Sequence, residues 1–422
     1  MAYYQLSLPI MDDQNYIAWS IVAVLALTIL LVFAFTKHHT YLSDQRSYTY
    51  GHLRMRIETI LRPQNLSLLD LLAERAKSNQ RLVRALQLSN TFVSDKPEVH
   101  KQFVGQAHGL LNHAQRRGWF MFQSIAMEAM EWYGLSESSG CPFDSLVQSI
   151  TLVVILVGLF QVDTPIDSFC HEDITLVANY ITTLWALSKK ADPIPSSLLN
   201  DLNDRLRLLV PDKDTFPQPL NFIVPAWETL WRVVATTVAY AQKDPQIQKE
   251  FAYFHDNPSE SRFREGQDGS ISVKSVVTEV MRLHPPSKHI ARMRRGPWCP
   301  SWIGRVIGIN GMIGYQKKVA DVEAILRCEE IWGMDSQVFK PERHHHPIIR
   351  EQEEVMGFVF GYGPLRCVAA SWAPMAASII SGAIIAHLET ENYILEQGQC
   401  IGSREGWNGW QVRRNPCIVS DS

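Results

Sequence analysis

The sequence predicts a mainly α-helical fold with a minor β part, preceded by a single N-terminal transmembrane helix. Three observations support this prediction: an uncharged apolar segment near the N-terminus, a long succession of helical patterns, and few, short strand patterns. The chain has 422 residues, of which 46% are hydrophobic and 20% are charged. This composition is typical of a folded protein with a large core and excludes a chain that is disordered throughout.

Charge and cysteine usage exclude two further classes of protein. Lys and Arg total 40 against 43 Asp and Glu, a net charge of -3, whereas nucleic-acid-binding proteins need a basic surplus. We therefore expect no nucleic-acid partner. The 7 cysteines are an odd number without a Cys-x-x-Cys pair, which indicates neither a disulfide framework nor a zinc site.

Residues 17–36 form the predicted transmembrane anchor. They carry no charge and are long enough to cross a hydrocarbon core of about 30 Å. Acidic residues precede the segment, and Lys37 and Arg46 follow it, so the positive-inside bias predicts residues 1–16 in the lumen and residues 37–422 in the cytosol. A cleavable signal peptide fits less well, because no basic residue precedes the segment and no small-x-small site closes it.

Helical patterns follow one another beyond the anchor. They cover residues 66–88, a helix starting at the Ser94 to Glu98 cap signal, and residues of about 106–133, 144–160, 173–190, 197–210 and 219–243. The apolar segments 150–160 and 368–386 are interpreted as interior helices, because the first is too short to cross a membrane and the second contains proline and several serines. Strand patterns are confined chiefly to residues 301–313 and 355–360.

The first of four local motifs is Pro225-Ala226-Trp227-Glu228-Thr229 within an apolar helix. Pro225 has no N–H, so the bond to the Asn221 carbonyl is lost and the helix should kink. Glu228 and Thr229 then place an acid beside an alcohol one turn later, a combination suited to proton delivery. Taken alone, the motif is better explained by an ordinary core helix in which Glu228 and Thr229 are neighbours by coincidence.

The second and third motifs predict an ionic network. Glu279 and Arg282 are three residues apart, share a helix face and can pair, although most pairs of this kind lie on the surface and contribute little energy. The segment Phe339-Lys340-Pro341-Glu342-Arg343 supplies a second arginine, Arg343, that completes a network of three charges. Buried networks of this kind act more as devices that fix the arrangement of segments than as sources of net stability.

The fourth motif runs from Phe360 to Ala369 and contains Gly361, Gly363 and Cys367. The glycines permit a tight turn that brings backbone close to a flat ligand. Cys367 stands just before a helix that is expected to begin near Ala369, and a helix N-terminus lowers the pKa of a thiol and favours the metal-binding thiolate. The alternative is a buried free cysteine, which is the commonest fate of an isolated Cys.

In this order, the four motifs resemble the cytochrome P-450 heme-thiolate monooxygenases over residues of about 215–390. The resemblance implies the P-450 fold, heme b as cofactor and Cys367 as the axial ligand of the heme iron. It implies that Thr229 and Glu228 relay protons and that Glu279, Arg282 and Arg343 support the cysteine loop. The other residues that it implies for cofactor binding are Arg292 and Arg366, expected on the heme propionates, and Phe360 and Gly363.

The chain departs from the pattern of this family at several positions. Leu365 and Ala369 replace an arginine and a glycine around the cysteine, and Arg366 is expected to supply the missing charge. The Trp-x-x-x-Arg pattern is absent, because Trp119 is followed four residues later by Gln123. Helical sequence follows the anchor almost at once, so the substrate-channel sheet is expected to be shortened or missing. The run of three histidines that begins at His344 is interpreted as a solvated loop.

The function implied by the resemblance is oxidation of a small hydrophobic molecule with O2. Electrons would come from an NADPH-dependent P-450 reductase, with a cytochrome b-type protein as a further donor. The residues of the motifs are most similar to those of filamentous-fungal, membrane-anchored members that act in secondary metabolism. This similarity implies a location in the endoplasmic reticulum. Two alternatives stay open: a heme-thiolate enzyme with non-oxygenating chemistry, and a heme-free, membrane-anchored binding protein that keeps the scaffold.

Overall fold

The computed structural model describes Thr28 and residues 49–135, 140–295, 315–345, 349–402, 404 and 406–416. The chain divides into two units, Met1–His52 and Leu53–Ser422, and the second is described here. Apart from Thr28, the predicted anchor at residues 17–36 lies outside the described residues, as do the strand expected at residues 301–313 and His346.

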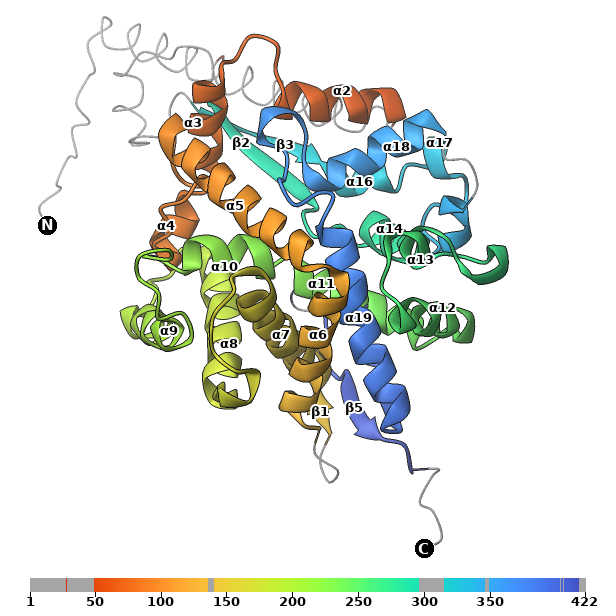
Figure 1. The fold of residues 1–422 in the computed structure, drawn as a ribbon. Helices are drawn as coiled ribbons and strands as arrows, with labels where there is room; N and C mark the ends of the chain where they lie inside the picture. The colour runs from red at the N-terminus through yellow and green to blue at the C-terminus, as the bar shows by residue number, and fades with distance from the viewer. Residues whose placement is uncertain are drawn as a thin grey trace, which may run out of the picture. The chain divides into compact units, whose positions relative to one another are not determined.

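Most of the second unit is helical, as predicted, and the helices surround one long central helix (Figure 1). Those of the N-terminal half are α2 (Tyr50–Leu61), α3 (Leu68–Ser78), α4 (Gln80–Leu86), α5 (Pro97–Arg117), α6 (Trp119–Tyr133), α7 (Phe143–Val154), α8 (His171–Ser188) and α9 (Ser196–Leu209). Those of the C-terminal half are α10 (Leu220–Trp227), α11 (Leu230–Ala241), α12 (Pro245–Asp256), α13 (Glu260–Arg264), α14 (Val273–Leu283), α16 (Val322–Leu326), α17 (Glu329–Trp332), α18 (Arg350–Gly357) and α19 (Ala373–Thr390).

Local sequence explains where several of these helices begin and end. Ser67 and Asp70 form a capping box that starts α3. Pro97 occupies the first turn of α5, where its missing N–H costs nothing. The predicted start of this helix is confirmed, but its N-cap is Lys96 and no side chain caps it. Gly118 adopts a φ of 84° between α5 and α6, which divides the predicted helix of residues 106–133 in two because a left-handed residue ends a helix.

The central helix α19 confirms the interior helix predicted for residues 368–386. It packs against α6, α11, α12 and α14, and Figure 1 shows it running through the middle of the unit. Within the described residues, α19 alone has the length and apolar composition of a membrane span, but 67% of that segment is buried inside the fold. It therefore belongs to the core. The apolar end of α7 continues into a π-helical segment, Ile155–Leu159, that is also largely buried.

The minor β part consists of two small antiparallel sheets in the described ranges. Strands β2 (His289–Arg295) and β3 (Tyr315–Asp321) pair with each other, with Arg292 opposite Lys318. Strands β1 (Cys141–Pro142), β5 (Gln411–Arg414) and β4 (Tyr393–Glu396) form the other sheet in that order. The strand predicted for residues 355–360 is wrong: these residues end α18 and form a 3-10 turn, since a short apolar run does not distinguish a strand from a buried helix end.

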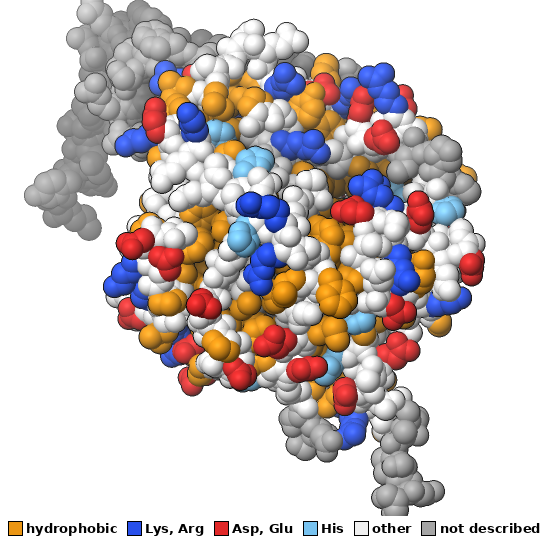
Figure 2. Space-filling model, in the orientation of Figure 1, with side chains coloured by type: hydrophobic (Ala, Val, Ile, Leu, Met, Phe, Trp, Pro, Cys, Tyr) orange, Lys and Arg blue, Asp and Glu red, His pale blue; other side chains and the backbone are white. Residues whose placement is uncertain are grey.

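The surface reflects the nearly balanced charge of the sequence. On the face drawn in Figure 2, basic and acidic side chains are interspersed with hydrophobic ones.

Candidate active site

The helix that contains Pro225 is interrupted, as the sequence predicts. Helix α10 ends at Trp227 and α11 begins at Leu230, with Glu228 and Thr229 in a turn between them. The Asn221 carbonyl, which Pro225 cannot bond, accepts a hydrogen bond from Asn90 Nδ2 at 2.7 Å. The carbonyl that Pro225 leaves without its helical bond thus has a partner from a distant segment of the chain.

Glu228 is buried and both of its carboxylate oxygens are occupied. Arg232 Nη2 donates to Oε2 at 2.9 Å, and the Arg404 guanidinium donates to Oε1. Arg404 also lies over the ring of Trp185, 4.7 Å from its centroid. Thr229 is half-buried beside this cluster, and no hydrogen bond or ion pair among the described residues joins either side chain to the cysteine loop. The predicted acid is therefore engaged by two arginines.

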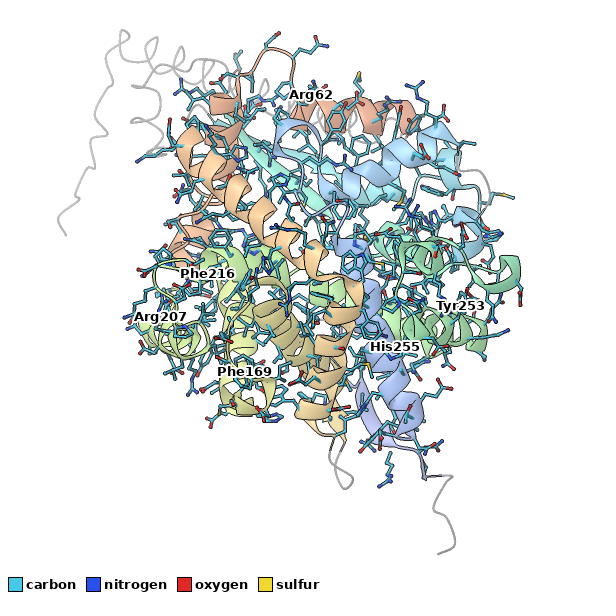
Figure 3. The ribbon with its side chains drawn as sticks, viewed as in Figure 1. Arg62, Phe169, Arg207, Phe216, Tyr253 and His255 are labelled. Atoms are coloured by element: carbon cyan, nitrogen blue, oxygen red, sulfur yellow. The ribbon has the colours of Figure 1, made fainter. Side chains whose placement is uncertain are left out.

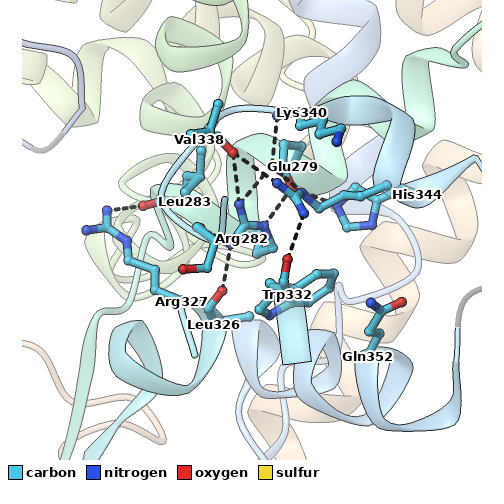
Figure 4. A network of polar contacts seen from close by, with 12 residues as sticks. Glu279, Arg282, Leu283, Leu326, Arg327, Trp332, Val338, Lys340, His344 and Gln352 are labelled. Atoms are coloured by element: carbon cyan, nitrogen blue, oxygen red, sulfur yellow. Dashed lines mark hydrogen bonds and ion pairs between the residues drawn. The ribbon is translucent and has the colours of Figure 1, made fainter. Parts of the chain in front are cut away.

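The predicted network of Glu279, Arg282 and Arg343 is confirmed as a geometric unit (Figure 4). Arg282 donates to Glu279 through Nε at 2.7 Å and through Nη2 at 2.8 Å, and Arg343 Nε donates to the same carboxylate at 3.0 Å. Arg282 Nη1 also donates to the Leu326 and Ser336 carbonyls. The network thus ties α14 to the loop between α17 and α18.

His344 is a fourth member of this network, which corrects its interpretation as part of a solvated loop. Its side chain is buried, and its Nε2 lies 2.8 Å from Glu279 Oε2. Only His345 of the described histidines in this run is exposed. Burial alone would raise the pKa of Glu279, but the hydrogen bonds from Arg282 and His344 lower it to about 2.

The cysteine loop has the tight backbone that its glycines predict. Gly361 and Gly363 have φ values of 78° and 73°, and the Cys367 N–H donates to the Phe360 carbonyl at 2.8 Å. A Cβ at Gly363 would lie 2.9 Å from Cβ of Arg62, the residue that follows α2 (Figure 3). The lack of a side chain at Gly363 therefore allows Arg62 to pack against the loop.

Two expectations about Cys367 are corrected. The helix after it, α19, begins at Ala373 rather than near Ala369, although the Ala369 carbonyl already accepts from the Trp372 and Ala373 N–H groups. Surrounding protein raises the pKa of the Cys367 thiol by desolvation, and the Ala369 N–H and Arg366 offset this only in part. The thiol nevertheless remains accessible to solvent.

Strand β2 connects the cysteine loop to a group of arginines. Ile290 Cδ1 lies 4.0 Å from the position of a Cβ on Gly361, and Arg292 is on the same face of the strand because side chains alternate. Arg292 is buried, and its Nε has no hydrogen-bond partner among the described residues. Burial lowers the pKa of Arg292 to about 10. The predicted cofactor contact therefore lies beside the loop with an unsatisfied donor.

Arg75 on α3 is a second buried arginine in this region. Its guanidinium donates to Thr91 Oγ1, and its Nε also lacks a partner in the described part of the chain. Burial, reinforced by the charge of Arg292, lowers the pKa of Arg75 to about 9. Arg75 and Arg292 thus lie on α3 and β2, which pack against each other.

Of two other candidate positions, Gln123 is bonded elsewhere in the fold and Arg366 is exposed to solvent. Gln123, which stands where the family has an arginine, directs Nε2 to Nδ1 of His255 at 2.9 Å (Figure 3). Arg366 is exposed.

Sequence reasoning missed Arg75, His344 and Arg404. Arg75 had a usable signal, because it falls on the apolar face of α3 with Leu71, Leu72 and Ala76, all of them buried. His344 directly follows Arg343, but its burial depends on the path of the loop. Arg404 had no signal, since its partner Glu228 is far away in the sequence.

Comparison with known proteins gives partial matches at low identity. No family model matches the chain. It is 26% identical over 180 residues to 11-oxo-beta-amyrin 30-oxidase from Glycyrrhiza uralensis, covering 40% of this chain and 32% of that protein. It is 32% identical over 110 residues to cytochrome P450 monooxygenase claQ from Ampulloclitocybe clavipes, covering 24% and 21%.

A further match is to benzoate 4-monooxygenase bphA from Aspergillus niger, 28% identical over 134 residues, covering 31% of this chain and 24% of that protein. The matched segments thus span between 21% and 32% of the length of these relatives.

Proposed function

Because the chain is a member of the cytochrome P450 superfamily, we propose that it is a heme-thiolate monooxygenase. In this proposal Cys367 binds the iron of heme b, and the substrate is a small hydrophobic molecule that is oxidised with O2. The observation that carries the proposal is the accessible Cys367 thiol on a glycine turn that contacts the strand of the buried, unsatisfied Arg292.

The donor set of this region suits heme. Within the described residues, no three His, Cys, Asp or Glu side chains gather as a metal site, so Cys367 would need a cofactor to supply the other ligands of a metal. Heme does so, and its carboxylates are suited to buried guanidinium groups. Arg292 would bind one of them, since its Nε lacks a partner. Phe360 and Gly363 would shape the loop that faces the cofactor.

Bound heme with a thiolate ligand supplies the O–O cleavage and the C–H oxidation that define this chemistry. The protein must then hold a proton close to the site of reaction. Thr229 stands in the turn between α10 and α11, next to Glu228. Glu228 would pass protons to Thr229 only after its ion pair with Arg404 loosens.

The Glu279 network would support the cysteine loop through the chain segment that precedes it. Arg282 and Arg343 fix the loop that precedes α18, and α18 leads directly to Phe360. The position of Phe360 in turn holds the Cys367 N–H. The thiolate would thus be oriented by backbone that a buried network holds in place.

We also propose that electrons reach the site from an NADPH-dependent P-450 reductase, with a cytochrome b-type protein as a further donor. The substrate would be an intermediate of secondary metabolism. Residues 17–36 would anchor the protein in the endoplasmic reticulum membrane with residues 37–422 in the cytosol. In microsomes washed with alkaline carbonate, the full chain should stay with the membrane, and a chain without residues 17–36 should be released. Retention of the shortened chain would contradict the anchor.

The heme proposal is tested by the carbon monoxide difference spectrum of the reduced full chain. Wild type should show the strongly red-shifted Soret band of thiolate-ligated heme, Cys367→Ser should lose it, and Cys400→Ser, a change at another exposed cysteine, should keep it. A folded wild-type protein without that band, or a Cys367→Ser protein that retains it, would contradict the proposal.

A further inference from the structure

We propose that Arg75 is a second cation for the carboxylates of the cofactor and takes the role of the arginine that this chain lacks four residues after Trp119. The assignment rests on the proposed heme site. It concerns a residue of α3, outside the four motifs. It follows from three features: Arg75 is a buried charge without a counter-ion, it lies in the region of Arg292, and the amide of Gln123 is bonded to His255.

Arg75 is a buried cation without a carboxylate. It is only 6% exposed, and in the described part of the chain it forms no ion pair. The adjacent Glu74 binds Arg294 instead, at 2.9 Å. The contacts of Arg75 are the Thr91 hydroxyl and the ring of Phe92, 5.3 Å from its centroid. A charge held in this way costs free energy unless an anion binds to it.

The position of Arg75 relative to Arg292 is fixed by neighbouring contacts. The ion pair between Glu74 and Arg294 joins α3 to β2, and Arg292 and Arg294 are on the same face of β2. Arg292 therefore lies between this ion pair and Ile290, which contacts the cysteine loop at Gly361. Arg75 is next to Glu74 on α3, so the contact between α3 and β2 brings it into the region of Arg292.

His100 adds a neutral donor to this region. Arg75 donates to Thr91 Oγ1, so the single Thr91 hydroxyl hydrogen is available for His100 Nδ1, which lies 2.8 Å away. Burial and the Arg75 charge lower the pKa of His100, which favours the neutral ring. In that state His100 Nδ1 accepts and its Nε2 carries the proton, so Nε2–H is a donor.

The chemistry of the ligand follows from this arrangement. Two buried guanidinium groups with unsatisfied Nε–H donors match a ligand that carries two carboxylates on one edge, as heme does. Gln123 cannot contribute a charge, and its amide is engaged by His255. Arg75 would thus provide from α3 the charge that the family pattern provides after Trp119.

The test compares heme with its dimethyl ester, which lacks both negative charges, in binding titrations of the full chain followed at the Soret band. Wild type should bind heme more tightly than the ester by at least about tenfold, since hydrogen bonds between charged groups exceed about 1.4 kcal/mol. Arg75→Met should reduce this ratio several-fold, and Arg75→Lys should restore part of it because Lys keeps the charge but not the planar fork.

Arg262→Met is the control, because Arg262, like Arg75, lies over an aromatic ring, that of Tyr253, but it is only half-buried. It should leave the ratio unchanged. The heme-free Arg75→Met protein should melt no lower than heme-free wild type, because the change removes an uncompensated buried charge.

An Arg75→Met protein that discriminates between heme and ester as wild type does would overturn the assignment, as would a heme-free Arg75→Met protein that fails to fold. A wild-type protein that binds heme through Cys367 while Arg75→Met keeps the ratio would leave the monooxygenase proposal standing and remove only Arg75. A folded wild type that binds neither compound would overturn both.

Discussion

Individual side chains around Glu279 show how much a single residue contributes to this fold. The Glu279 carboxylate accepts hydrogen bonds from Arg282, Arg343 and the Lys340 N–H, and it also contacts His344. The desolvation cost of burying an anion is offset only when its oxygens are fully bonded. His344 therefore completes a set of partners that the two arginines leave unfinished.

We expect His344→Ala to lower the free energy of unfolding by about 2 kcal/mol, because it removes a hydrogen bond to a buried charge. His345→Ala is the control, since His345 is exposed, and should change it by less than about 0.5 kcal/mol. Urea denaturation of the full chain in detergent measures both. Equal losses in the two variants would contradict the assigned role of His344.

Residue-scale prediction from sequence was successful where residues are close in the chain. Glu279 and Arg282 share one turn of α14, so their spacing alone predicts the pair. The expected thiolate at Cys367 was a weaker inference: the sequence indicates a following helix, but desolvation by surrounding segments raises the pKa of the thiol. Burial of that kind depends on the packing of distant segments.

At the scale of elements, the break between α10 and α11 shows a local rule completed by a distant segment. Pro225 removes the bond to the Asn221 carbonyl, as the sequence predicts, and Asn90 supplies the replacement. The Asn221 side chain also accepts from the Ser89 N–H at 2.9 Å. The segment after α4 is thus fixed to the interrupted helix by polar contacts.

Asn90→Ala should lower the free energy of unfolding by about 1 kcal/mol or more, and by less in a Pro225→Ala background. In that background residue 225 regains an N–H that bonds the Asn221 carbonyl. A double-mutant cycle measures this coupling. The hydrogen bond that Asn90 Oδ1 accepts from the Phe92 N–H is lost in both backgrounds, so it cancels. Strictly additive losses would contradict the exchange of partners.

For the molecule as a whole, a half-buried histidine links stability to pH. His284 lies 3.0 Å from the Tyr240 hydroxyl through Nε2. Burial, with nearby cations such as Arg327, lowers the pKa of His284 from 6.5 to about 4. Between these values the unfolded chain binds more protons than the folded one, so folding stability falls as the pH falls from 6.5 to about 4.

We expect His284→Gln to flatten part of this decline, because glutamine keeps a polar partner for Tyr240 but does not titrate. Denaturant midpoints of both proteins at about pH 7 and about pH 5 give the comparison. The stability that Glu279 contributes is fully present above its ordinary pKa of 4.5 and is lost only as the pH falls from there toward about 2, so it does not change between the two pH values compared. Parallel declines in the two proteins would show that His284 is not responsible.

The sequence by itself determined the helical class, most helix positions and the four motifs, because these depend on residues within a few turns of one another. It misassigned residues 355–360 as a strand for the same reason, since a six-residue apolar run carries no periodicity that separates the two states. The tertiary structure decided the rest: the Arg404 contact with Glu228, the burial of His344, and the placement of Arg75 beside Arg292. These depend on desolvation and on contacts between segments far apart in the chain, which local sequence does not specify.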